Sequence, residues 1–240
     1  MEQKEVWFIT GAATGLGHHL MRGLLQNGHQ VAAVSRDKDS LQGLIGRYLA
    51  DDRRAGSDGK TEVGWQAENL LCLSADLTRE DSVQAAIQQT ILQFGRIDKV
   101  VNYAGCDLYT PAGELSESVL HHLFEESIFG TFHVLRQVLP HLQRQRSGII
   151  LTYSSPAAIA AAAGSPLYAA TKLAIEHLTE ELTAGMEALG IEQTIVGPGP
   201  GFLAPTPTGP NGSRPVRPKN YNPCAGLFEK QAFQRSAYWA

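Results

Sequence analysis

Tyr168 and Lys172 are the two residues whose types and spacing most directly suggest chemistry. They stand four positions apart in a stretch that reads as the first turns of a helix, because Pro166 suits a first helical turn. At that spacing the two side chains share a face, with Cβ atoms roughly 5–6 Å apart. A free tyrosine loses its proton near pH ~10, and a neighbouring ammonium stabilises the phenolate. The pair is therefore suited to exchanging a proton at neutral pH. The helix is predicted to run well past residue 180, with a buried stripe at Leu178, Leu182, Met186 and Leu189.

A hydroxyl group precedes this pair by thirteen residues, at Ser155. It follows the apolar run 148–152, which predicts a strand, so Ser155 is expected at the carboxyl edge of a sheet. Sheets of the α/β kind bind their ligands at that edge. The alternative is a turn or helix-capping serine, since Ser154 stands beside it.

A glycine-rich loop directly follows the first apolar run, residues 6–9, and leads into a helical pattern that closes at Asn27-Gly28. A strand, a glycine loop and a helix N-terminus together form a pyrophosphate site, because backbone N–H groups and the helix dipole face a ligand that glycines allow to approach. The alternative is a tight strand-to-helix turn without a ligand. The candidate residues are Thr10, Gly11, Gly15, Leu16 and Gly17.

The tip of the second predicted strand, residues 31–34, carries Ser35 and Arg36. An acidic residue there would bind the ribose 2′-hydroxyl of NAD, whereas a guanidinium suits a 2′-phosphate by its charge and its fork of donors. The sequence therefore favours NADP over NAD. Asp37 leaves two possibilities open, since it can reach back to a ribose or start the next helix, and Arg36 can also be simply solvated.

Two further strand ends supply candidate cofactor contacts. Asp76 and Leu77 follow the apolar run 70–73, where Asp76 can meet the adenine or instead cap a helix with Thr78. Small residues after the strand at 98–101 let a cofactor lie against the backbone, and the residues concerned are Asn102, Ala104 and Gly105.

The apolar runs are continuous rather than alternating, which is typical of strands covered on both faces. With helical patterns between them, they predict a single-domain α/β fold with a doubly wound parallel sheet, the Rossmann fold, over residues 1–203. Residues 204–240 differ: a proline-rich, irregular segment leads to a possible short helix, and we expect it to cover the substrate site. The apolar stripe of a long helix at 116–145 is a candidate subunit interface, which predicts a homodimer or homotetramer.

Composition excludes several classes of function. With 24 acidic and 20 basic residues among 240, the net charge of −4 gives no electrostatic case for nucleic acid or an anionic membrane. The three cysteines are far apart and have no C-x-x-C spacing, so neither a disulfide framework nor a metal site is indicated. No apolar stretch approaches the ~18 residues of a membrane span, and we expect a soluble, cytoplasmic protein.

Taken together, these motifs resemble those of the short-chain dehydrogenase/reductase family over about residues 4–203. The resemblance implies that Tyr168 is the general acid/base, that Ser155 holds the substrate oxygen, and that Lys172 assists Tyr168 and binds the nicotinamide ribose. The motifs that carry the resemblance are Thr10-Gly-x-x-x-Gly-x-Gly17, Asn102-x-Ala104-Gly105, Ser155, Tyr168-x-x-x-Lys172 and Pro198-Gly199. By the same resemblance, Asn102, Ala104 and Gly105 shape the adenosine side, and Pro198 and Gly199 lie along the nicotinamide.

The chain departs from the family pattern in three places. Ser127 stands where many relatives have an asparagine that anchors a water linked to the lysine, Tyr103 stands where a second asparagine is common, and no seventh strand is apparent after residue 203. The leading hypothesis is therefore an NADP(H)-dependent carbonyl reductase or secondary-alcohol dehydrogenase acting on a ketone or alcohol. The alanine-rich run 157–163, between Ser155 and Tyr168, suggests an apolar wall for the substrate, and the alternative is simple packing of small residues. Because of the departures, a cofactor-binding scaffold with a regulatory or non-redox role, such as a cyclase, is the alternative.

Overall fold

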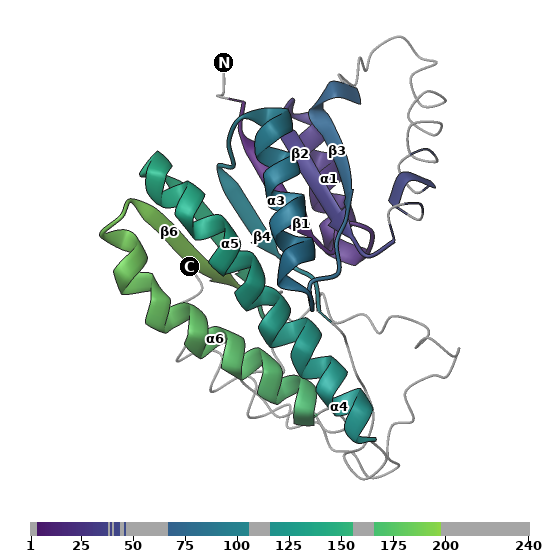
Figure 1. Ribbon diagram of the computed structural model, residues 1–240, viewed down its shortest axis with the longest axis vertical. Helices are drawn as coiled ribbons and strands as arrows, with labels where there is room; N and C mark the ends of the chain where they lie inside the picture. The colour runs from purple at the N-terminus through teal and green to yellow at the C-terminus, as the bar shows by residue number, and fades with distance from the viewer. Residues whose placement is uncertain are drawn as a thin grey trace, which may run out of the picture.

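Six parallel strands form the sheet of the computed structural model, in the order β3-β2-β1-β4-β5-β6 (Figure 1). The structure describes residues 4–37, 67–105, 116–155 and 166–197, together with residues 39, 41–43 and 46. The strands are β1 (Val6–Thr10), β2 (Gln30–Ser35), β3 (Leu70–Ser74), β4 (Lys99–Asn102), β5 (Gly148–Tyr153) and β6 (Ile191–Val196). The predicted doubly wound parallel sheet is confirmed.

The strand order reverses at β1, which pairs with β2 on one side and with β4 on the other. The connections that leave β1 and β4 at their carboxyl ends therefore run to opposite sides, and a crevice opens between them. In doubly wound sheets this switch point is where ligands bind.

Helices cover both faces of the sheet (Figure 1). They are α1 (Gly15–Gln26), α3 (Glu80–Phe94), α4 (Glu117–Phe124), α5 (Gly130–Gln145) and α6 (Pro166–Glu187), with a short 3₁₀ turn, η2 (Ala67–Asn69), before β3. On one face Phe8 packs among residues of α3, α5 and α6, and on the other Trp7 and Ile9 pack against α1. Burial on both faces explains why β1 is apolar at successive positions, as predicted.

The long helix expected at 116–145 is not continuous α-helix. A π-helical segment, η4 (Glu125–Phe129), separates α4 from α5, and the N–H of Gly130 bonds to the carbonyl of Glu125 five residues back. Gly130 also lies so close to the chain before α3 that a Cβ there would sit 3.0 Å from Leu77. Pro140 lies further along the chain, inside α5.

The buried stripe of α6 also differs from the prediction. Met186 is buried, but Leu189 lies beyond the end of the helix and is 39% exposed, while Leu178 and Leu182 are only half-buried. The buried face instead carries polar residues: Thr171, Lys172, Glu176 and Thr179. The same face also carries the buried Ile175 and Met186, and Lys172 is the one of these four polar residues that lines the cleft. Within the described ranges, none of the helices has the length and apolar character needed to cross a membrane.

Candidate cofactor and active site

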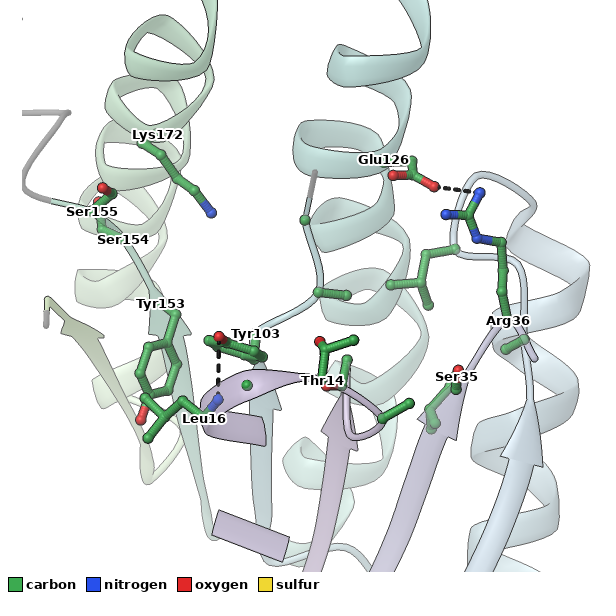
Figure 2. A pocket seen from close by; sticks show the side chains of 18 of the residues that line it. Thr14, Leu16, Ser35, Arg36, Tyr103, Glu126, Tyr153, Ser154, Ser155 and Lys172 are labelled. Atoms are coloured by element: carbon green, nitrogen blue, oxygen red, sulfur yellow. Dashed lines mark hydrogen bonds and ion pairs between the residues drawn. The ribbon is translucent and has the colours of Figure 1, made fainter. Parts of the chain in front are cut away.

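A cleft of about 570 Å³ opens at the carboxyl ends of the strands, at the switch point beside β1 (Figure 2). Eleven of the sites predicted from sequence contribute to its wall: Gly11, Gly15, Leu16, Ser35, Arg36, Leu77, Ala104, Gly105, Ser155, Tyr168 and Lys172. The cleft therefore brings the candidate phosphate, ribose and catalytic residues to one place.

The glycine loop is shaped by close backbone approaches. Gly11 has a φ of +71°, a conformation that side chains rarely adopt, and a Cβ on Gly17 would lie 2.6 Å from the carbonyl oxygen of Gly11. The first turn of α1 thus packs directly on the loop. The N-cap residue Thr14 makes no side-chain capping bond, so it does not itself occupy the N–H groups of this helix N-terminus.

Tyr103, which follows β4, lines the cleft and lies against this loop. Its hydroxyl accepts a hydrogen bond of 3.4 Å from the N–H of Leu16, and its ring lies 3.0 Å from the position of a Cβ on Gly17. Its ring meets Tyr153 edge to face, with centroids 5.2 Å apart (Figure 2). Burial, and then the nearby Tyr103, raises the pKa of Tyr153. Nothing in the sequence pattern pointed to this contact.

Two of the predicted cofactor residues, Thr10 and Asn102, are buried and do not line the cleft. The Thr10 hydroxyl is buried, donates to the carbonyl of Val101 and accepts from the N–H groups of Tyr103 and Ala104, all at 3.2 Å. It therefore fixes the end of β4 against the loop. Asn102 is buried too, and its side-chain amide has no hydrogen-bond partner among the described residues.

The three candidate catalytic residues come together in the cleft. Ser155 follows β5, while Tyr168 and Lys172 lie on the first turns of α6, and all three are at most 8% exposed. The Lys172 Nζ atom lies 5.4 Å from the centroid of the Tyr168 ring. The same atom would be 3.4 Å from a Cβ at Gly105, so the missing side chain leaves room for the ammonium. The predicted one-turn spacing on a shared helix face is realised.

The tip of β2 faces helix η4 across the cleft. Arg36 forms an ion pair there with Glu126, with 2.7 Å between Nη1 and Oε1 (Figure 2). Glu126 was not among the predicted site residues, because its position depends on the π-helical segment rather than on any local motif. The Arg36 carbonyl also accepts a bond of 2.9 Å from the Ser74 hydroxyl, which ties the tips of β2 and β3 together.

Asp76 is engaged with its own chain. Its carboxylate accepts bonds from both the N–H and the hydroxyl of Thr78, at 3.0 and 2.7 Å. The hydrogen bond from the Thr78 hydroxyl is the main reason that the pKa of Asp76 is lowered. Asp76 is not the helix cap that was one of its two predicted roles, because the N-cap of α3 is Arg79. Ala75 and Leu77 line the cleft on either side of Asp76.

Comparison with known proteins agrees with this architecture. The family model for short chain dehydrogenase matches residues 5–207. The chain belongs to the short-chain dehydrogenase family.

Two relatives of this short-chain dehydrogenase are similar to it in sequence. L-fucose dehydrogenase of Oryctolagus cuniculus is 31% identical over 198 residues, which are 81% of this chain and 62% of that protein. An oxidoreductase of Schizosaccharomyces pombe is 33% identical over 132 residues, 55% of this chain and 56% of that protein. The chain thus spans less than two thirds of the length of both relatives.

Two solved structures of the same fold are also similar. A short-chain dehydrogenase from Streptomyces avermitilis has a TM-score of 0.70 and 28% identity, covering 82% of this chain and 66% of that one. ElxO with NADP bound has a TM-score of 0.66 and 26% identity, covering 82% of this chain and 73% of that one.

Ser127, which departs from the family pattern, lies close to the lysine. It is fully buried in η4, and its hydroxyl has no hydrogen-bond partner among the described residues. Its carbonyl accepts a bond of 2.8 Å from the Thr131 hydroxyl. Both its hydroxyl and the Lys172 ammonium lie within 4 Å of the position of a Cβ on Gly105, so a side chain at 127 is placed to influence the lysine.

Some predicted parts of the dehydrogenase site lie outside the described residues. These are Pro198 and Gly199, the alanine-rich run 157–163 and the segment 204–240.

Proposed function

We propose that this short-chain dehydrogenase is an NADP(H)-dependent carbonyl reductase or secondary-alcohol dehydrogenase that acts on a small ketone or alcohol. The observation that carries the proposal is the gathering of Ser155, Tyr168 and Lys172 in the cleft that also holds the glycine loop. Each has the chemistry that carbonyl reduction needs: a hydrogen-bond donor, a proton donor and a fixed positive charge.

The described residues fit a nicotinamide dinucleotide. A Cβ at Gly17 would lie 2.6 Å from the Gly11 carbonyl oxygen, and a Cβ at Gly11 would lie 3.0 Å from the Ala104 nitrogen after β4. The helix N-terminus has no acidic residue in its first turn. Gly11, Gly15 and Leu16 would hold the pyrophosphate, and Lys172 the nicotinamide ribose. When bound, the nicotinamide supplies or accepts the hydride.

The protein residues then manage the substrate oxygen and its proton. The Ser155 hydroxyl donates a hydrogen bond to that oxygen, and the Tyr168 hydroxyl transfers a proton to it during reduction. The Lys172 ammonium stabilises the phenolate left on Tyr168, and this effect is strengthened because both side chains are buried. In the oxidative direction the phenolate takes the proton back from the alcohol.

The preference for NADP rests on Arg36. Its guanidinium stands at the tip of β2 and lines the cleft, where a basic side chain suits a 2′-phosphate. The similarity to ElxO, which was solved with NADP bound, supports the same cofactor. The alternative of a scaffold without redox turnover has less support, because the three candidate catalytic residues are present and gathered in one cleft.

The test is a direct assay of the purified protein. Incubation with NADPH and a panel of ketones, followed by the absorbance of the reduced nicotinamide, is expected to show oxidation of NADPH with at least one ketone. The Tyr168→Phe variant, assayed in parallel, is expected to remain at the background rate. Binding of NADPH without turnover on any ketone, or on any secondary alcohol with NADP, would favour the scaffold instead.

A further inference from the structure

The ion pair between Arg36 and Glu126 joins the two walls of the cleft where the adenosine end of a dinucleotide would bind. Arg36 comes from the tip of β2 and Glu126 from the π-helical segment η4, ninety positions later in the chain. Both residues line the cleft, and Figure 2 shows the two side chains pointing toward each other across it. The guanidinium predicted to bind a 2′-phosphate is therefore already bound to an anion of the protein itself.

The two partners of the pair differ in exposure. The Arg36 side chain is 61% exposed and ends a long flexible stem, whereas the Glu126 side chain is 14% exposed and is held by helical backbone on both sides. The other described ion-pair partner of this carboxylate is His122, one turn earlier, with Nε2 3.4 Å from the same Oε1 atom. The carboxylate is thus the fixed member of the pair and Arg36 the adaptable one.

A fixed carboxylate has opposite consequences for the two nicotinamide cofactors. A 2′-phosphate beside Arg36 either competes with Glu126 for the guanidinium or shares it, and in both cases two anions come close in a partly buried place. A 2′-hydroxyl meets no such repulsion and can donate a hydrogen bond to a carboxylate. Glu126 therefore opposes the preference that Arg36 creates.

We propose that Glu126 is a specificity-determining residue that weakens NADP(H) binding relative to NAD(H) by neutralising Arg36. The inference rests on the proposed function, because it assumes that the cleft binds a nicotinamide dinucleotide with its adenosine ribose at the tip of β2. By this inference, the ion pair of Arg36 and Glu126, and not Arg36 alone, sets the relative affinity for NADP(H) and NAD(H).

The experiment measures dissociation constants of NADPH and NADH by fluorescence titration for the wild type and for Glu126→Gln. Glutamine keeps the size of the side chain and an oxygen that accepts from Arg36, so it removes the charge and preserves the positioning of Arg36. We expect the affinity for NADPH relative to NADH to rise roughly threefold to fivefold, the upper range for one partly exposed charge pair. Glu126→Ala, a second variant in case the first does not fold, is expected to shift the ratio in the same direction.

A matched control is available one position earlier. Glu125→Gln makes the same change of net charge in the same π-helical segment, but Glu125 is exposed and does not line the cleft. The affinity of this variant for NADPH relative to NADH is therefore expected to equal that of the wild type. If the affinity for NADPH relative to NADH is unchanged or lower in both folded Glu126 variants, this inference alone is overturned. A wild-type protein that binds neither dinucleotide overturns the proposed function, and this inference with it.

Discussion

The hydroxyl of Ser154 donates a hydrogen bond of 2.6 Å to the Oε1 atom of Glu176, and both residues are buried. The bond fastens the end of β5 to α6, immediately before Ser155 and one helical turn after Lys172. It therefore connects the two elements that supply the candidate catalytic residues. The Glu176 carboxylate is therefore expected to hold β5 and α6 in their relative positions, and with them the candidate catalytic residues.

Loss of this carboxylate is expected to affect both stability and turnover. Glu176→Ala leaves the Ser154 hydroxyl buried without its acceptor, which should cost ~1–3 kcal/mol of unfolding free energy, and it should lower kcat by releasing Ser155. Glu176→Gln keeps an acceptor for the Ser154 hydroxyl and should retain more of the stability and more of kcat than Glu176→Ala. The control is Glu180→Ala, an exposed glutamate one turn further along α6. Equal melting temperatures for Glu176→Ala and Glu180→Ala would contradict the role.

Tyr168→Phe should reduce kcat by about 10²–10⁴-fold, the usual contribution of general acid–base catalysis. The variant deletes the transferable proton but leaves the glycine loop and Lys172 unchanged, so NADPH affinity should stay nearly the same. Single-turnover kinetics and a binding titration separate the two quantities. A variant that keeps most of the wild-type kcat would remove Tyr168 from the mechanism.

Gly17→Ala and Gly23→Ala make the same change on one helix with opposite expected effects. The Cβ at position 17 would lie 2.6 Å from the Gly11 carbonyl, so the loop must move, and NADPH affinity should fall by about tenfold or more. At position 23 a Cβ meets nothing within 4 Å, so alanine should stabilise α1 by about 0.5–1 kcal/mol and leave binding unchanged. Isothermal titration measures the NADPH affinity of the two variants, and thermal unfolding measures their stability. Similar NADPH affinities in the two variants would show that the contact between Gly17 and Gly11 is not needed for binding.

Ser127→Asn should raise kcat, because an amide supplies a donor and an acceptor near the Lys172 ammonium, where the present hydroxyl has no partner among the described residues. The comparison variant is Ser127→Ala, which removes the hydroxyl without adding a relay. The measurement is kcat as a function of pH for all three proteins. Coinciding profiles for Ser127→Asn and wild type would mean that proton supply to Lys172 is not limiting.

Asp76 should contribute a pH-dependent part of the stability. Its pKa is lowered in the folded protein, chiefly by the hydrogen bond from the Thr78 hydroxyl, so its contribution is present above the unfolded pKa of about 3.9 and is lost as the pH falls through the folded value. Asp76→Asn should therefore melt below the wild type at pH 7, and the difference should shrink below pH 4. Thermal unfolding at several pH values tests this, and a difference that is constant with pH would contradict it.

Much of this protein could be predicted from its sequence because the decisive signals are local. The strand at 6–9 is apolar at every position because both of its faces are covered. Gly11 and Gly15 have positive φ values, and Gly17 lies close to the Gly11 carbonyl, which are features of one loop and one helix turn. The pairing of Tyr168 with Lys172 follows from helix geometry alone. All three signals can be read from a few consecutive residues, so they were visible in the sequence before the rest of the fold was known.

Only the tertiary structure decided which side chains meet across the cleft. Glu126 reaches Arg36 because a π-helical segment interrupts the predicted long helix, and Glu176 reaches Ser154 because the buried face of α6 turns toward β5. The expected apolar stripe on α6 holds at Met186, which is buried, and at Leu182, which packs against the core, but it is wrong at Leu189, because α6 ends at Glu187. The rotation, end and packing of each helix depend on contacts between distant segments, and the periodicity of one segment does not contain that information.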